Sequence, residues 1–374
     1  MQNGHRETMS YLRDWRQALR APHVYRVANS TFRIQSQYLA VVLLLLVLFV
    51  FYYGSSLVHG VIRPAQLAQA LPQCHHYKYN KTYPVSTPIR TSKGVTYKIA
   101  IVSDLDHDSK SMDKKDTWQS IMKTGSLFWN PNANFVSIVW DDRTVTLSSS
   151  LSMKGRGMEL SELVTFDGRL LSFDDRTGMV FVIEGEEAFP WLILMDGNGK
   201  NSKGFKSEWA TVKDEHLYVG SAGKEWTTPS GEFLHYNPLW IKVISPRGEV
   251  ESINWISNYD RLRQAINIEY PGMPRNSIKD VPRSDIMIPE TKCVSSQQYP
   301  KIFLVIKIGE LIPIRGYSSF KFLPGSQDSI IVALKTEEFQ GKTATYISVF
   351  TIDGTTLMAE SRVVDKKFEG LEFI

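Results

Sequence analysis

SELVTFDGRLLSF, residues 161–173, joins two short strand-forming runs through an Asp-Gly turn, and the chain repeats this phrase. It returns as SEWATVKDEHLYV (207–219) and SSFKFLPGSQDSIIV (318–332), and its opening occurs once more in FEGLEFI (368–374). Runs of Val, Ile, Tyr, Phe and Trp that end at Gly, Asp or Asn are typical of strands. The phrase therefore predicts an all-β fold made of repeats, apart from a short helix expected at 258–267.

The spacing of the phrases gives the size of the repeat. Glu162 and Glu208 lie 46 residues apart, Glu208 and Ser319 lie 111 apart, and Ser319 and Glu369 lie 50 apart. A period of roughly 40 to 50 residues with about four strands is typical of propeller blades. Because 111 residues count as two periods, the spacing predicts a five-bladed β-propeller. The last strand, 368–374, must pair with strands from the beginning, since its edge would otherwise stay open.

An apolar run precedes the repeats. YLAVVLLLLVLFVFYYGSSL, residues 38–57, has no charge between Arg33 and His59, and about 20 apolar residues can span a bilayer. A buried core helix is the alternative, which fits this length less well. Six arginines before the run predict a cytosolic N-terminus. The expected type II, single-pass organisation is a cytosolic tail (1–37), a transmembrane signal-anchor helix (38–58), a lumenal stalk (59–95) and the propeller (96–374).

The remaining bulk features narrow the class of protein. The net charge of +4 is too small to indicate a nucleic-acid partner. Two cysteines, Cys74 and Cys293, allow one disulfide at most. Asn80-Lys81-Thr82 is an N-glycosylation sequon on the expected lumenal side.

Polar residues at the start of each phrase predict a metal site. The first strand of each propeller blade lines the central channel, so equivalent positions face one another across the axis. The residues expected there are Ser161, Glu162, Glu208, Ser318 and Glu369. Converging carboxylates repel and raise their own pKa values unless a cation joins them, and Ca²⁺ takes about 6–8 oxygen ligands. The set lacks His and Cys, which disfavours zinc and copper. Solvated strand ends are the alternative interpretation.

At these residues the sequence resembles a known family, the calcium-activated nucleotidases, or apyrases of the bed-bug salivary type. The motifs that carry the resemblance are IVSDLDHDSK (101–110), KGRGMELSELVTFDGRLLSFDDRTG (154–178), PWLILMDGNG (190–199), KGFKSEWATVKDEHLYVGSAGKEWT (203–227), GYSSFKFLPGSQDSIIVALKTEE (316–338) and FEGLEFI (368–374). The resemblance implies a five-bladed propeller with Ca²⁺ in the channel, held by the five residues named above. It also implies hydrolysis of nucleoside diphosphates such as UDP and GDP, and of triphosphates as further substrates.

The resemblance further implies a location and a nucleotide-binding mouth. The expected location is the Golgi or endoplasmic reticulum lumen, with a secreted form after stalk cleavage and a homodimer as further possibilities. The catalytic candidates are Asp104, Asp106, Glu159 and Asp175, and the substrate-binding candidates are Arg156, Lys203, Lys224, Glu225 and Trp226. Asp175 also fits an ordinary turn with a local ion pair, and Trp226 fits either a nucleobase contact or the core. DGNGK (196–200) predicts a hairpin turn, because it lacks the following Glu of an EF-hand loop.

Residues 272–308 depart from the family. The resemblance is expected to stop after Tyr270-Pro271-Gly272 and to resume near Gly309. The segment lacks the family's His-Glu-Ser and Trp-Ser-Asp motifs and, with them, a calcium glutamate of the fourth blade. A splice variant, a wrongly predicted exon and real divergence stay open as explanations. The alternative function is therefore a catalytically impaired propeller that acts as a binding module. A propeller glycosidase is a second rival, which the basic residues at the mouth disfavour.

Overall fold

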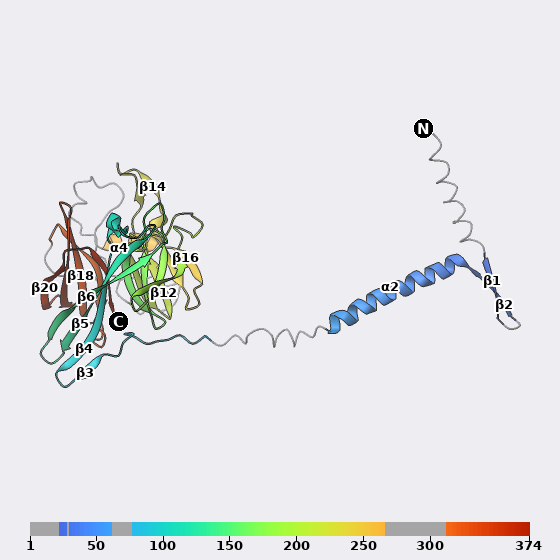
Figure 1. Cartoon of the computed structure of the whole chain (residues 1–374), viewed down its shortest axis with the longest axis horizontal. Coiled ribbons are helices and arrows are strands. Elements are labelled where there is room, and N and C mark those ends of the chain that lie inside the picture. Colours follow the sequence, from blue (N-terminus) through green and yellow to red (C-terminus); the bar gives the residue numbers. More distant parts are fainter. Residues whose placement is uncertain (1–21, 28–29, 62–76, 266–311) are drawn as a thin grey trace. The chain divides into compact units, whose positions relative to one another are not determined.

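The computed structural model of this chain describes residues 22–27, 30–61, 77–265 and 312–374. Two compact units share the chain, Met1–Lys78 and Tyr79–Ile374. The first contains an antiparallel hairpin of β1 (Pro22–Val27) and β2 (Ser30–Gln35), which leads directly into helix α2 (Ser36–Val61) (Figure 1).

Helix α2 is 26 residues long and has no acid in its first turn. Its side chains are described from Val41 to Tyr53, and each of these is 51–77% exposed. In the described part of the chain, no helix reaches the length and apolar character needed to cross a bilayer. The transmembrane helix expected at 38–58 is thus not confirmed.

The second unit is a propeller-like set of antiparallel four-stranded sheets, which we call blades 1 to 4 (Figure 1). Blade 1 runs, from inside outward, β21 (Phe368–Phe373), β4 (Gly94–Ser103), β5 (Trp118–Asn130), β6 (Phe135–Ser149). Blade 2 runs β7 (Leu160–Phe166), β8 (Arg169–Asp174), β9 (Met179–Glu184), β10 (Glu187–Ile193). Blade 3 runs β11 (Trp209–Lys213), β12 (His216–Gly220), β15 (Trp240–Ile244), β16 (Val250–Asn254). Blade 4 runs β17 (Arg315–Phe322), β18 (Ile330–Phe339), β19 (Lys342–Thr351), β20 (Thr356–Val364).

Short elements decorate the blades. They are β3 (Ile89–Thr91), which pairs with β4, the hairpin β13 (Trp226–Thr227) and β14 (Phe233–His235), the 3₁₀ turns η1 (Asp106–Ser109) and η2 (Asn237–Leu239), and helix α4 (Ile256–Ala265). The helix confirms the short helical stretch expected near 258–267.

The number of blades differs from the expectation. The described residues form four blades, not five. The interval of 111 residues between two phrases was counted as two repeats. Residues 266–311, which include the atypical segment 272–308, fall within that interval and lie outside the described residues. The repeat period thus located the four blades but does not establish a fifth.

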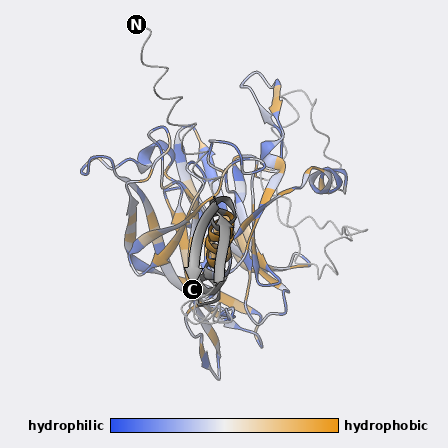
Figure 2. Ribbon diagram, turned by 90° about the vertical axis from the view of Figure 1, so that its right-hand side faces the viewer, coloured by the Kyte–Doolittle hydropathy of each residue, from blue (hydrophilic) through white to orange (hydrophobic). Residues whose placement is uncertain are grey.

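The closure of the ring is confirmed. Strand β21, at the C-terminus, pairs with β4, near the start of the propeller, and Leu371 lies opposite Ile101. Burial follows position in the blade: every residue of β7 is buried, whereas β20 on the outside is mostly half-buried or exposed. Figure 2 shows hydrophobic stretches along the strands and mostly hydrophilic connections between them.

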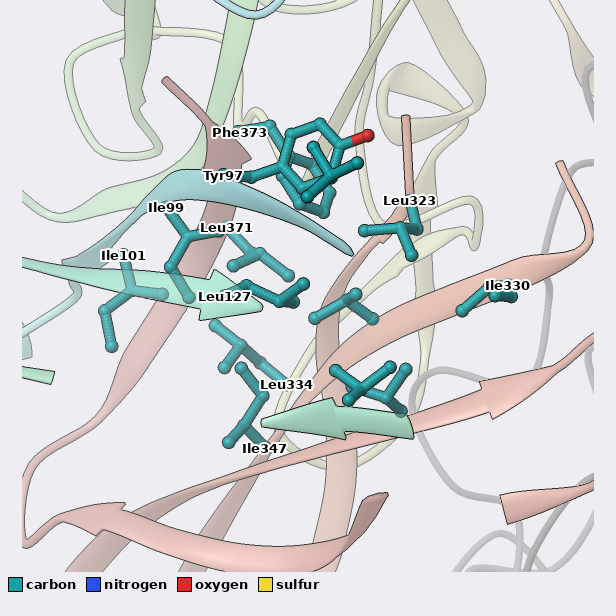
Figure 3. Close-up of a cluster of buried hydrophobic side chains, with 14 of the residues drawn as sticks. Tyr97, Ile99, Ile101, Leu127, Leu323, Ile330, Leu334, Ile347, Leu371 and Phe373 are labelled. Atoms are coloured by element: carbon teal, nitrogen blue, oxygen red, sulfur yellow. The ribbon is translucent and has the colours of Figure 1, made fainter. Parts of the chain in front are cut away.

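A large apolar cluster joins the closing blade to its neighbour. Figure 3 shows Tyr97 and Phe373 of blade 1 near Leu323 and Leu334 of blade 4. The rings of Tyr97 and Phe373 meet edge-on, with centroids 5.6 Å apart. Because β-branched and aromatic residues of two sheets interdigitate here, hydrophobic burial holds the first and last parts of the propeller together.

The inner strands approach one another closely near the axis. Strand β7 contacts β11 on one side and β21 on the other, and β21 contacts β17. A Cβ atom on Gly370 would lie 2.6 Å from the backbone of Glu162 and Leu163. Only glycine at this position allows β21 and β7 to pack this tightly, and the close packing brings the starts of the two strands together.

Residues expected to form the end of the stalk pack on the propeller. The backbone N–H of Asn80 donates to Asp167 Oδ1 at 2.7 Å, and the Tyr83 hydroxyl donates to Glu372 Oε1 at 3.0 Å. The compact unit accordingly begins at Tyr79, ahead of the boundary expected at residue 96. Asn80 itself is exposed.

The DGNGK segment is a turn, as predicted. The Asp196 N–H donates to the Lys203 carbonyl at 2.9 Å, and Gly197 and Gly199 adopt positive φ. Protein groups already occupy its oxygens: Asn237 Nδ2 donates to Asp196 Oδ2, and the buried Lys242 Nζ donates to the Gly197 carbonyl at 2.6 Å. The turn is therefore a point of attachment between blades 2 and 3.

Candidate functional site

The inner strands of three blades carry a β-bulge at the same point. The register slips between Leu160 and Glu162, between Tyr317 and Ser319, and between Phe368 and Gly370. The residues skipped by the pairing are Ser161, Ser318 and Glu369. A bulge leaves one residue outside the ladder and re-aims its side chain, and bulges are frequent beside functional sites.

Glu208 occupies the corresponding point of blade 3. It comes directly before β11, and its N–H donates to the Gly220 carbonyl at 2.9 Å, next to the Trp209–Gly220 pair. We refer to Ser161, Glu208, Ser318 and Glu369 together as the bulge ring. Four of the five residues expected to bind metal thus share one structural position.

The second strands of blades 1, 2 and 3 each bring another polar residue to this end. Because neighbouring strands are antiparallel, the end of the second strand lies beside the start of the first. Asp104 follows β4, Asp175 follows β8 and Ser221 follows β12, and these side chains are 3%, 6% and 3% exposed. The topology therefore explains why residues from far-apart phrases gather at one end of the channel.

Two lysines link the carboxylates of the bulge ring to the strand-end aspartates. Lys206 Nζ lies 2.9 Å from Glu208 Oε1 and forms an ion pair with Asp175 Oδ2. Lys367 Nζ lies 3.3 Å from Glu369 Oε1 and 2.7 Å from Asp104 Oδ2. Four carboxylates from three blades thus share two ammonium groups, which leaves two negative charges in excess.

This excess shows in the pKa values of the acids. Burial and the neighbouring charge of Asp104 raise the pKa of Glu369 well above its usual range; Lys367 opposes this shift, and Glu208 and Asp175 add to it. Burial raises the pKa of Asp175 to about 7, Lys206 opposes the shift, and Asp104 and Glu208 add to it. A cation placed among these groups would relieve both the repulsion and part of the desolvation.

A third group of acids lies beside the first. Arg156 Nε donates to Glu159 Oε1 at 2.7 Å, and its Nη2 lies 3.2 Å from Asp106 Oδ1. Lys367 also reaches Asp106 Oδ2 at 3.2 Å. Despite burial, Lys367 and Arg156 hold the pKa of Asp106 below its usual value. Arg156 thus pairs with both Asp106 and Glu159, and this group joins the site through the contact of Asp106 with Lys367.

Glu162 faces different partners from the bulge ring. Ser161, the skipped residue, donates through its Oγ to the Ser207 carbonyl, whereas the side chain of Glu162 contacts β17. Its Oε1 accepts from Ser319 Oγ at 3.1 Å and lies 3.5 Å from Lys321 Nζ. Burial raises the pKa of Glu162 to about 7, Lys321 opposes this, and Glu372 adds to it. The structure gives Glu162 a place in an ion-pair network between β7, β17 and β21.

The remaining expected substrate-binding residues lie near the β13–β14 hairpin. Lys203 Nζ lies 4.2 Å from the centroid of the Trp226 ring, and Trp226 lies parallel to His235 at 6.2 Å. Lys224 is exposed. Glu225 is buried and pairs with Arg263 of α4 at 3.3 Å, so it anchors the helix. The half-buried Lys203–Trp226 pair is a cation–aromatic contact of a kind suited to a nucleotide.

The donors of the bulge ring fit a hard divalent cation. They are carboxylate and hydroxyl oxygens, the ligands that Ca²⁺ prefers, in a setting with excess negative charge. Within the described ranges, Asp175 Oδ1 and Ser221 Oγ are buried without a hydrogen-bond partner. Carboxylate oxygens of Asp104, Asp106 and Glu159 also lie within 4.8 Å of one another. That second grouping already holds Arg156 and Lys367, which makes it the weaker cation site.

Lys206 and Lys367 were not among the site residues predicted from the sequence. A signal was present, since each lysine stands two residues before a ring glutamate, in Lys206-Ser-Glu208 and Lys367-Phe-Glu369. Ser221 was missed as well, although it follows a second strand in the same way as Asp104 and Asp175.

Comparison with known proteins gives consistent matches. The family model described as Apyrase matches residues 105–279 and 283–374. A rat protein named soluble calcium-activated nucleotidase 1 (Rattus norvegicus) is 45% identical over 317 residues, which cover 79% of this chain and 78% of the relative. A protein of Cimex lectularius named apyrase is 41% identical over 317 residues, covering 79% of this chain and 87% of the relative.

The extent of the family match corrects one expectation. The resemblance was expected to stop after residue 272 and to resume near Gly309. The match instead continues to residue 279 and resumes at 283. The atypical segment, 272–308, lies outside the residues that the structure describes.

Proposed function

Because this chain belongs to the apyrase family, we propose that it hydrolyses the phosphoanhydride bond of nucleoside diphosphates such as UDP and GDP in a Ca²⁺-dependent reaction. Triphosphates are proposed as further substrates. The observation that carries the proposal is the meeting of Glu208, Glu369, Asp104 and Asp175 at one end of the propeller, where two lysines pair with them in the described part of the chain.

The bulge ring would hold the cation. Glu208 and Glu369 supply negatively charged oxygens, and Ser161 and Ser318 supply hydroxyls from the blades beside them. The hydroxyls now donate to backbone carbonyls, Ser161 to Ser207 and Ser318 to Phe368 at 3.1 Å, which fixes their position next to the ring glutamates. Bound Ca²⁺ supplies charge neutralisation for the diphosphate oxygens.

Asp175 is proposed to orient and deprotonate the attacking water. Of its two carboxylate oxygens, Oδ2 is held by Lys206, whereas Oδ1 has no hydrogen-bond partner in the described part of the chain. A general base needs an acceptor atom within reach of the proton that it removes. Asp104, Asp106 and Glu159 are held by Lys367 and Arg156, which suits them to positioning these cations.

The basic and aromatic groups around the ring would bind the nucleotide. Phosphoryl transfer requires charge neutralisation and alignment more than covalent chemistry from the protein. Arg156 has a planar guanidinium suited to two phosphate oxygens. Lys203 and Trp226 together offer a charge and an aromatic face, which fits a nucleotide better than a neutral sugar.

The proposal is tested by assaying UDP hydrolysis by the purified full-length chain with Ca²⁺, with Mg²⁺ and with a chelator. We expect Ca²⁺ to raise the rate by at least about 100-fold over the chelated sample, because several kcal/mol of charge stabilisation is lost with the ion. Equal rates with and without Ca²⁺ contradict the proposal. Ca²⁺-dependent UDP binding without turnover would favour the non-enzymatic binding module instead.

We also propose that the propeller lies in the secretory lumen of the Golgi or endoplasmic reticulum and is anchored through α2. Support comes from the uncharged run between Arg33 and His59, the arginines that precede it, and the exposed sequon at Asn80. In sealed microsomes, UDP hydrolysis should appear only after detergent is added, and the protein should stay with the membranes in alkaline carbonate. Full activity without detergent, or release by carbonate, argues against this arrangement.

A further inference from the structure

Lys206 and Lys367 hold equivalent positions in two blades. Each stands two residues before a ring glutamate and bridges it to a strand-end aspartate, which belongs to the adjacent blade 2 for Lys206 and to the same blade for Lys367. Lys206 joins Glu208 to Asp175, and Lys367 joins Glu369 to Asp104. The lysine side chains are 27% and 12% exposed, so both ammonium groups are largely withdrawn from solvent.

An ammonium group and a divalent ion that share one carboxylate repel each other and compete for its negative charge. Lys206 Nζ is 2.9 Å from Glu208 Oε1, and Lys367 Nζ is 3.3 Å from Glu369 Oε1, which is contact distance for a charged hydrogen bond. A divalent ion brought to the ring would meet two positive charges within a few ångströms. Binding of the ion thus requires the lysines to move or to weaken their contacts.

We propose that Lys206 and Lys367 compete with Ca²⁺ for Glu208 and Glu369; this inference rests on the proposed function. The ion displaces both lysines from the two glutamates. Their ammonium groups then become available to the phosphate groups of the nucleotide. This displacement couples the binding of Ca²⁺ to the binding of phosphate. By linkage, a phosphate that binds the released lysines also favours binding of the ion, and the effect is reciprocal.

The coupling predicts opposite effects of one substitution on two ligands. Removing a lysine charge takes away a competitor, so Lys206→Met and Lys367→Met should each bind Ca²⁺ about tenfold more tightly or better, since unit charges a few ångströms apart interact by more than about 1 kcal/mol even at high effective dielectric. The same variants should bind inorganic phosphate more weakly. A lysine with only a structural role would show weaker binding of both.

The experiment titrates Ca²⁺ alone into the metal-depleted full-length chain by calorimetry, and then inorganic phosphate in the presence of saturating Ca²⁺. Lys321→Met is the matched control, because Lys321 is 13% exposed and lies 3.5 Å from the buried Glu162, outside the bulge ring. Its Ca²⁺ affinity should stay within about twofold of the unsubstituted chain. Unchanged or weaker Ca²⁺ binding in both ring-lysine variants overturns the proposal.

A second measurement needs no variant. Lysine acetylation followed by mass spectrometry should label Lys206 and Lys367 faster when Ca²⁺ is added, while Lys321 keeps its rate. Equal labelling with and without Ca²⁺ contradicts the displacement. Ca²⁺-dependent UDP hydrolysis, measured in parallel, separates the competitor role from the proposed function. If hydrolysis depends on Ca²⁺ but the lysine variants keep their Ca²⁺ affinity and the labelling rates do not change, only the competitor role fails. If the unsubstituted chain does not bind Ca²⁺ at all, the proposed function fails as well.

Discussion

Replacing Glu369 by Gln should reduce the Ca²⁺ affinity of the chain, and the hydrolysis of UDP at limiting Ca²⁺, on the order of 100-fold or more. Glu369 is one of two carboxylates in the bulge ring, and Gln keeps its size while removing the charge. Burial and the nearby charges of Asp104, Glu208 and Asp175 raise the pKa of Glu369 well above its usual range, so a bound cation would favour its ionised form. Calorimetric titration of Ca²⁺ alone measures the affinity directly.

Glu372→Gln is the matched control for this substitution. Glu372 lies on the same strand, β21, and is more deeply buried, and it accepts hydrogen bonds from Tyr83 and from the Thr165 N–H at the other end of the strand. Its substitution should alter stability and leave Ca²⁺ affinity unchanged. If Glu369→Gln and Glu208→Gln both keep the original Ca²⁺ dependence, the bulge ring does not bind the ion.

Replacing Asp175 by Asn should lower kcat for UDP about 10²- to 10⁴-fold, the range of a lost general base, and should reduce Ca²⁺ affinity far less than Glu369→Gln does. A general base must be ionised, so kcat of the unsubstituted chain should rise with pH as Asp175 loses its proton and level off above that pKa. Without the ion the pKa of Asp175 is about 7. Because bound Ca²⁺ favours the ionised form, the rise should lie below pH 7. The Asn variant should lack it.

The division between kcat and Ca²⁺ affinity separates two roles for Asp175. A metal ligand would lose Ca²⁺ affinity on substitution, whereas a base would lose turnover at saturating Ca²⁺. Asp106→Asn provides the comparison, because Asp106 is held by Arg156 and Lys367 and is half exposed. Asp175 is not the base if kcat falls more in Asp106→Asn than in Asp175→Asn and the Asp175→Asn variant still shows the rise of kcat with pH.

Much of the fold follows from local patterns in the sequence. Apolar runs such as KIAIVSD (98–104) and IIVALK (330–335) lie in strands β4 and β18, since alternation and β-branched residues report directly on strand structure. The pairing of 368–374 with the first blade could also be predicted, because an unpaired strand would expose its edge. The fifth blade could not be established, since the interval between two phrases gives a length and not the structure that fills it.

The candidate site was predicted unevenly. Reading the phrases by their letters placed Ser161 and Glu162 together, as if both faced the channel. The structure separates them, with Ser161 skipped at the bulge and Glu162 directed to Ser319 and Lys321. It also sets Glu225 apart, in a buried pair with Arg263. Whether the ring binds Ca²⁺ stays a prediction until the titrations above are made.

The sequence by itself determined the repeating strands, the ring closure and the kinds of side chain at the start of each repeat, because these depend on short-range patterning. Only the tertiary structure decided which of these side chains meet. The physical reason is the two-residue alternation of a strand, in which a slip of one position turns a side chain from one face to the other. The bulges make that slip in three blades, and they bring Glu369 and the two serines to the position that Glu208 holds in the remaining blade.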